Sequence, residues 1–219
     1  MCFLTGVYGK FAPGHVTSIR LLIQDGHWVA QASDILSGAT VGGNAACLET
    51  GSGAGGDTEE YSWLQGSPAT TMQTTDNYAC FLSGIQGVFQ GGGESVTIGS
   101  SGTNYILSGS SQQTGVGAYA RCIGTTQPKF VHEIGPFTSY ATQSLETYGR
   151  SWYGSPGQLQ VFPVCLLTMI SGRLQSSSQF GGNSVFLTVS PQYAPNNWQG
   201  VVRSVGNWVY ANATCIDGY

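Results

Sequence analysis

Short runs of alternating apolar and polar residues recur along the chain and predict β-strands, because successive side chains of a strand point to opposite faces. The clearest runs come in three pairs, each separated by residues that favour turns, so we expect three antiparallel hairpins. These hairpins join residues 18–23 to 28–31, residues 95–98 to 104–107, and residues 184–189 to 201–205. Asp25-Gly26 suits the tight turn of the first hairpin, and the third has the longest loop, 191–200.

One sequence pattern occurs three times and divides the chain into units. Residues 2–11 (CFLTGVYGKF) align without gaps on residues 80–89 (CFLSGIQGVF), and residues 165–174 (CLLTMISGRL) are a looser third copy. Each unit closes on an Ala-x-Cys motif followed by Leu or Ile, at Cys47, Cys122 and Cys215. With two cysteine-bearing segments beside its hairpin, each unit is predicted to be a short antiparallel meander of about four strands.

The repeats set the expected domain organisation. Units are expected at residues 1–48, 80–123 and 165–219, with linkers at 49–79 and 124–164. The linkers carry similar segments, WLQGSP from Trp63 and WYGSP from Trp152, each predicted to be a strand. No such segment precedes Cys2, so we expect an N-terminal truncation, a strand donated from elsewhere or an atypical capping unit. The units are expected to pack as a β-prism- or trefoil-like body, and beads on linkers are the alternative.

The six cysteines occupy equivalent positions in the three units and predict three disulfides. The repeat favours one bridge within each unit, Cys2–Cys47, Cys80–Cys122 and Cys165–Cys215. Metal binding by these cysteines is the alternative, but no Cys-x2-Cys pair occurs and the three histidines occupy unrelated positions. Disulfides would place the mature protein outside a reducing cytosol, in an extracellular location or on a virion surface.

The amino-acid composition argues against several classes of binding partner. Only 8% of the 219 residues are charged, against roughly 25% in an ordinary soluble domain. The seven lysines and arginines are scattered singly, so we expect no nucleic-acid partner. No apolar run approaches the ~18–20 residues that span a bilayer, so we expect no membrane insertion, and the first residues lack a signal-peptide pattern.

The sequence contains no familiar catalytic motif. A Gly-x-Ser-x-Gly nucleophile elbow, a phosphate-binding loop and His-Glu-x-x-His are all missing, so we predict no catalytic residues, no metal and no cofactor. His132-Glu133 is interpreted as an exposed loop pair. The acidic residues 57–60 form either a solvated loop, which we favour, or a calcium site. An enzyme would have to use a carboxylate found in one unit only, such as Glu60 or Glu94.

Aromatic residues provide the candidate binding surface. Trp28 and Tyr105 occupy equivalent hairpin positions, and packing is favoured over sugar stacking for both. The polar stretches 108–113 and 195–199 have the composition of sugar-binding loops. We predict ligand contacts from the third hairpin loop, by Tyr193, Asn196, Asn197 and Trp198. Alternatively, Trp198 packs in the core or in a subunit interface.

The repeated pattern resembles the disulfide-bearing repeat β modules of bacteriophage virions and bacterial surface fibres. The resemblance rests on Cys-Phe-Leu-(Thr/Ser)-Gly-(Val/Ile)-x-Gly-x-Phe, on GGGESV at 91–96, and on SSQQ at 110–113 with Arg121-Cys122. It covers the whole chain as three copies and assigns no functional residues; unit three departs most, with Met169 in place of the glycine.

The resemblance, the low charge and the missing catalytic motifs lead to one expectation for the role of the protein. We expect a non-enzymatic structural or receptor-binding component of a phage virion or other extracellular assembly. Its expected partners are a glycan or host-surface receptor, further copies of the chain in a homo-oligomer, or other virion proteins. A secreted carbohydrate-binding lectin and an extracellular glycan-active enzyme are the alternatives.

Overall fold

The computed structural model describes residues 1–12, 17–34, 41–48, 59–124, 131–138, 146–148, 164–174, 183–190, 197–203 and 209–216. Every regular element in these ranges is a β-strand, which confirms the all-β prediction. Unit one holds β1 (Cys2–Gly9), β2 (Thr17–Gln24), β3 (His27–Asp34) and β4 (Val41–Cys47), and the first linker holds β5 (Tyr61–Leu64) and β6 (Thr70–Thr74). Unit two holds β7 (Tyr78–Gln86), β8 (Ser95–Ser101), β9 (Asn104–Ser110) and β10 (Gly117–Gly124), and the second linker holds β11 (Val131–Thr138) and β12 (Glu146–Tyr148). Unit three holds β13 (Val164–Gly172), β14 (Ser184–Ser190), β15 (Asn197–Arg203) and β16 (Val209–Ile216).

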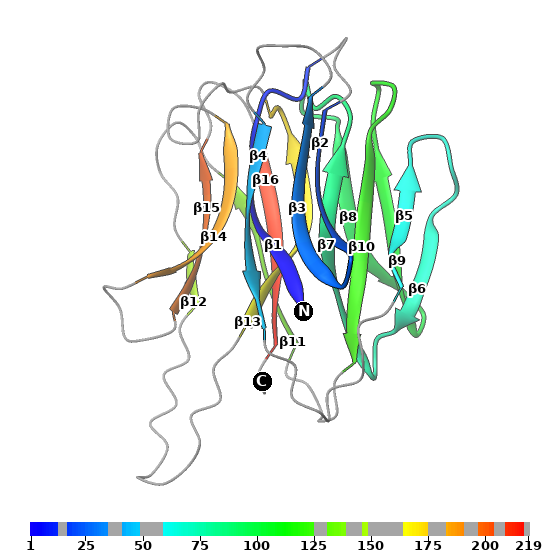
Figure 1. Ribbon diagram of the computed structural model, residues 1–219, viewed down its shortest axis with the longest axis vertical. Helices are drawn as coiled ribbons and strands as arrows, with labels where there is room; N and C mark the ends of the chain where they lie inside the picture. Colours follow the sequence, from blue (N-terminus) through cyan, green and yellow to red (C-terminus); the bar gives the residue numbers. More distant parts are fainter. Residues whose placement is uncertain are drawn as a thin grey trace, which may run out of the picture.

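The strands form three open sheets, and each sheet joins two units (Figure 1). Sheet 1 has the order β12-β15-β14-β1-β4, sheet 2 the order β3-β2-β7-β10-β5, and sheet 3 the order β11-β16-β13-β8-β9-β6. In every sheet the hairpin of one unit pairs with the first cysteine-bearing strand of the next: β2 with β7, β8 with β13, and β14 with β1. This cyclic exchange excludes separate beads on linkers. The prism- or trefoil-like packing of the sheets stays a prediction.

A ring of three backbone hydrogen bonds joins the units at one end of the body. Phe11 N donates to Leu174 O (2.8 Å), Leu174 N to Phe89 O (3.0 Å), and Phe89 N to Phe11 O (2.9 Å). All three residues are fully buried and hold the same position in the repeat. Two residues before each ring member the chain takes a positive φ, at Gly9 (122°), Gly87 (98°) and Gly172 (103°). Glycine is needed there because L side chains rarely adopt this conformation.

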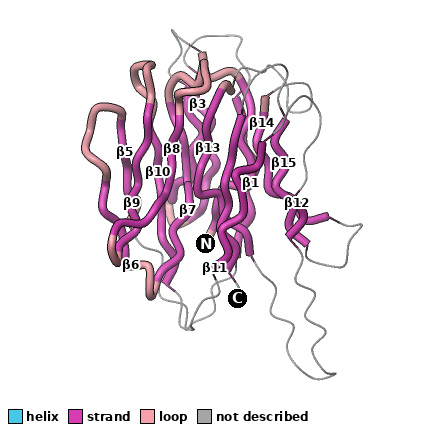
Figure 2. The backbone as a smooth tube through the Cα atoms, turned by 180° about the vertical axis from the view of Figure 1, so that it is seen from behind, coloured by secondary structure: helices cyan, strands magenta, loops and turns pink. Residues whose placement is uncertain are grey.

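The three predicted disulfides are confirmed: Cys2–Cys47, Cys80–Cys122 and Cys165–Cys215. Each bridge joins the first strand of a unit to its last, and no cysteine is left as a metal ligand. Figure 2 shows the same body from behind, with strands throughout and turns at their ends.

A core cluster between the units uses the same repeat position three times. Phe3, Phe81 and Leu166 follow the first cysteine of their units, and they pack with Ile123 and Ile216 from two closing strands. The rings of Phe3 and Phe81 meet edge to face, with centroids 6.1 Å apart. Since equivalent residues bury one another here, each unit needs the other two to complete its core.

The third hairpin differs from the prediction. Strand β15 begins at Asn197, so the expected loop 191–200 is wrong for its last residues. Trp198 takes the ladder position that Trp28 and Tyr105 hold in the other two hairpins. Residues 197–200 have the composition of a loop, but they form a strand. Pairing with β14 on one side and with β12 on the other provides partners for their backbone hydrogen-bonding groups.

The second linker differs as well. His132 and Glu133 were expected in an exposed loop, but they lie within β11, paired with β16. Phe137 takes the ladder position on β16 that Trp63 takes on β10, so Phe137 is the register counterpart of Trp63. Trp152, the expected counterpart, lies outside the described residues.

Candidate functional site

A shallow groove of about 680 Å³ lies between the turn after β5 and the loop that joins β9 to β10. Eight of its nine lining residues are glycine, serine, threonine or glutamine, and one is aromatic. The lining residues are Trp63, Gln65, Gly66, Ser67, Gly109, Ser110, Ser111, Thr114 and Gly115. The groove thus joins two stretches, 63–68 and 108–113, that the sequence analysis had identified separately.

Trp63 forms the floor of the groove. Its side chain is buried, with 6% of the residue exposed, and its Nε1 donates to Ser67 O (3.2 Å). The indole lies against Gly109, where a Cβ atom would come within 2.5 Å of the ring. Trp63 therefore acts as a packing residue, because so buried an indole has little free face for a sugar ring.

Hydrogen bonds fix the walls of the groove. Gln65 donates twice to the loop before β10, from Nε2 to Ser111 O (2.9 Å) and from its backbone N to Val116 O (2.8 Å). Ser111 Oγ in turn donates to Gln113 O (2.9 Å) and accepts from Gln113 N (2.8 Å). The remaining side-chain oxygen of Gln65 is buried and has no hydrogen-bond partner among the residues that the structure describes, so it is not open to a ligand in the groove. Gln65 thus joins the two sides of the groove and fixes its wall.

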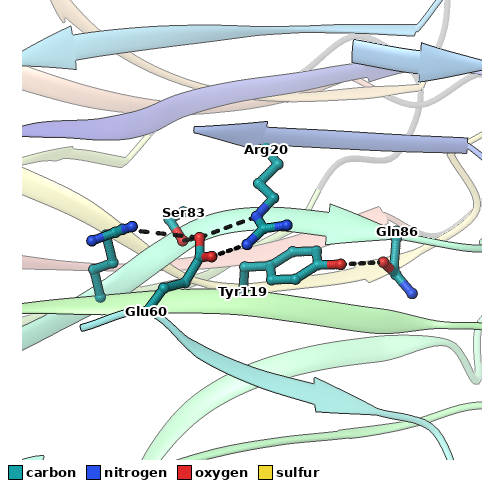
Figure 3. A network of polar contacts seen from close by, with 6 residues as sticks. Arg20, Glu60, Ser83, Gln86 and Tyr119 are labelled. Atoms are coloured by element: carbon teal, nitrogen blue, oxygen red, sulfur yellow. Dashed lines mark hydrogen bonds and ion pairs between the residues drawn. The ribbon is translucent and has the colours of Figure 1, made fainter. Parts of the chain in front are cut away.

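A second polar cluster surrounds Glu60, one of the carboxylates that an enzyme would need (Figure 3). Its carboxylate accepts hydrogen bonds from the guanidinium of Arg20 and from Ser83 Oγ (3.2 Å), and lies 3.9 Å from Arg121 Nε. The guanidinium of Arg20 also stacks 4.0 Å above the ring of Tyr119. The hydrogen bond from Arg20 to Glu60 raises the pKa of Arg20 above its usual value, and burial partly opposes this rise.

The Glu60 cluster holds strands together. Arg20, Glu60 and Arg121 come from β2, from the residue before β5, and from β10, which are separate strands of sheet 2. Arginine side chains approach both oxygens of the carboxylate, so the cluster links three strands of the sheet. Asp57 and Thr58 lie outside the described residues, so the calcium site considered for residues 57–60 stays an open alternative.

Glu94, the other candidate carboxylate, is also part of the framework. It is 3% exposed, and its carboxylate accepts a hydrogen bond from Gly91 N. Its backbone carbonyl accepts from Ser171 Oγ (2.9 Å) and Gly172 N (2.8 Å) of the next unit. In the part of the chain that the structure describes, no three His, Cys, Asp or Glu residues gather as metal ligands.

The predicted ligand residues are only partly placed by the structure. Asn197 and Trp198 lie in β15, whereas Tyr193 and Asn196 fall outside the described residues. The groove was not predicted as a unit, because its two sides are far apart in sequence and meet only through the pairing of β5 with β10 and β6 with β9. The signals available were the turn residues after Trp63 and the polar stretch 108–113.

In comparisons with models of protein families, with curated proteins and with solved structures, no match to this chain was found. A search for membrane spans found no long apolar helix among the residues that the structure describes.

Proposed function

We propose that this chain is a non-enzymatic structural or receptor-binding component of an extracellular assembly, such as a phage virion, and that its groove binds a surface glycan. The observation that carries the proposal is the lining of the groove by residues that bear hydroxyl groups, Ser67, Ser110, Ser111 and Thr114, on two sides that Gln65 joins. Such groups suit the hydroxyls of a sugar. A wall that is already hydrogen-bonded loses little conformational entropy when a ligand binds.

Other features support the same function. Of the carboxylates that a glycan-active enzyme could use, Glu60 is engaged in contacts between strands, and Glu94 is buried and accepts a hydrogen bond from Gly91 N of its own loop. Three disulfides are consistent with an oxidising environment outside the cell. The resemblance to repeat modules of phage particles and surface fibres indicates an assembly component. The cluster of Tyr193, Asn196, Asn197 and Trp198 stays a second predicted surface for a glycan.

A bulky substitution in the groove tests the proposal. Thr114 is exposed at the groove, and Thr103 is exposed at the turn between β8 and β9, outside its lining. The protein is first screened against immobilised bacterial polysaccharides and animal oligosaccharides. We expect Thr114→Tyr to weaken binding of the best glycan about tenfold or more by occupying the groove, and Thr103→Tyr to leave it unchanged. Both variants should keep the melting temperature of the parent.

Two results would contradict the groove as the glycan site. One is the binding of no glycan in the screen, and the other is equal binding by both tyrosine variants. The mass of the protein in solution separates the two binding roles. A monomer that binds a glycan with roughly micromolar affinity favours a secreted lectin, whereas a stable oligomer favours the assembly component.

A further inference from the structure

Two strand positions are filled in units two and three but open in unit one, within the ranges that the structure describes. Strand β5 pairs with the outer edge of β10, and β11 pairs with the outer edge of β16. The corresponding strand of sheet 1 is β4, which pairs with β1 alone. Likewise β6 and β12 pair with the outer edges of β9 and β15, whereas β3 ends sheet 2.

The ladders define what belongs beside β4. Ala45, Ala120 and Ala213 are equivalent, because each lies opposite the leucine two residues after the first cysteine of its unit. On the outer side, Ala120 faces Tyr61 and Ala213 faces Ile134. A strand added to β4 would therefore place a bulky apolar residue opposite Ala45.

Burial marks the open edge of β4. Ala45 and Cys47 are exposed. Their counterparts in the two covered strands are at most 1% exposed: Ala120, Cys122, Ala213 and Cys215. The same apolar positions that are buried in sheets 2 and 3 thus face solvent in sheet 1, beside a strand edge that has no partner among the described strands.

The edge of β3 shows the same difference. Ala30 and Ala32 are exposed, whereas Leu107, the ladder counterpart of Ala30 in the second hairpin, is fully buried. In that hairpin β6 covers the edge, and its Met72 is 6% exposed within the main core cluster. One segment shaped like β5 and β6 would therefore fill both open edges.

We propose that the outer edges of β4 and β3 accept a pair of β-strands donated by another polypeptide of the assembly. Recognition would be by strand addition, in which backbone hydrogen bonds supply affinity and side-chain pockets supply specificity. The donor has bulky apolar residues at the positions of Tyr61 and Trp63, a turn, and a threonine-rich second strand with an apolar residue at the position of Met72. This inference rests on the assembly role but not on the glycan groove.

The acceptor also specifies a donor without charge at the position of Glu60. In sheet 2, Glu60 meets Arg20 and Arg121. Their ladder positions in sheet 1 are held by Phe186 and Ala46, which offer no positive charge. A carboxylate buried there would lack a partner, so an apolar residue is preferred.

A second copy of this chain fits the edge less well than a donor. Its β5 and β6 already pair within its own sheets. If two copies paired through their β4 edges, each copy would contribute only Gly43 and Ala45 on the core-facing side of β4. In sheet 2, the strand beside the equivalent edge contributes Tyr61 and Trp63 on that side. These small residues cannot fill the space that two aromatic side chains fill.

A labelled peptide tests the acceptor directly. The peptide spans residues 59–77 with Glu60→Val and is titrated into the intact protein while its fluorescence anisotropy is followed. We expect saturable binding of one peptide per chain, and a melting temperature raised by about 5 °C or more at ~100 times the Kd. The peptide with Glu60 retained should bind about tenfold more weakly.

Two protein variants distinguish the faces of β4. Ala45→Lys places an ammonium under the donated strand and should weaken binding about tenfold or more. Asn44→Lys is the matched control, because Asn44 is exposed on the opposite face of β4. The counterpart of Asn44 in sheet 2 is Tyr119, which lies opposite the exposed Ser62 of β5. The lysine at position 44 should therefore leave peptide binding unchanged. Failure of the peptide to bind, or equal binding by both variants, would overturn the proposal. So would a dimer of the unliganded protein that Ala45→Lys dissociates, because the occupant would then be a second copy. None of these three results bears on glycan binding at the groove.

Discussion

Gly109 provides a direct measure of how tightly the floor of the groove is packed. A Cβ atom at this position would lie 2.5 Å and 2.7 Å from two ring carbons of Trp63, and 2.4 Å from the backbone oxygen of Ser95. Real Cβ atoms do not come this close to other heavy atoms, so Gly109→Ala must displace the indole, the strand, or both. Overpacking of this kind costs about 1–3 kcal/mol. For a protein of this size, the melting temperature should fall by roughly 2–4 °C per kcal/mol.

The control is Gly99→Ala, in the strand paired with β9. A Cβ atom at Gly99 meets nothing within 4 Å, so we expect a change within about 0.5 kcal/mol. Urea unfolding with the disulfides intact measures both variants. Trp63→Phe removes the two ring carbons that crowd Gly109, so the double variant should lose less stability than the sum of the single changes. Complete recovery is not expected, because the contact with Ser95 remains. The reasoning is refuted if Gly109→Ala matches Gly99→Ala, or if the two changes at the groove are simply additive.

Three further outcomes follow from the contacts described above. A low concentration of dithiothreitol should reduce the Cys2–Cys47 bridge first, since Cys47 alone among the six cysteines is exposed. Mass spectrometry after alkylation gives the order of reduction, and simultaneous reduction of all three bridges would contradict the prediction. Glu60→Gln should lower the free energy of unfolding in urea by about 1–3 kcal/mol, because two arginines lose their carboxylate; a loss below ~0.5 kcal/mol would mean the cluster is only a surface ion pair. Gly87→Ala should lower the free energy of unfolding by more than about 1 kcal/mol, since the φ of 98° favours glycine and a Cβ atom would lie 2.3 Å from the backbone oxygen of Gly115. An unchanged urea unfolding curve would contradict this prediction.

The sequence was informative wherever the repeat itself carried the signal. Each cysteine pair could be predicted because both partners belong to motifs that recur three times, and Asp25-Gly26 located the first hairpin turn. The turn forms because Asp25 and Gly26 both adopt positive φ, as a tight hairpin requires. These features depend on local sequence or on a relation within one unit.

Features that depend on contacts between units were not predicted. The alternation in 18–23 shows that this segment is a strand, but does not show that β2 pairs with β7 of the next unit. Trp198 looked like a loop residue because it is flanked by amides, yet its partners in β14 and β12 determine its conformation. The groove was missed for the same reason, since Gln65 and Ser111 meet only after two sheets have formed.

The cyclic exchange of hairpins has a consequence for how the protein can be made. Strand β1 is synthesised before the other described strands, but its partner β14 comes from the last unit, so sheet 1 cannot form until β14 has been synthesised. Until then, the edge of β1 that β14 will cover must stay unpaired. Pairing between such distant segments is slow, and a nascent chain that waits with an open edge is prone to aggregate. A polypeptide released early, for example after unit two, would retain this open edge permanently. Sheet 2 needs no strand beyond Gly124, but sheets 1 and 3 both contain strands of unit three, so the complete body can form only after unit three has been synthesised.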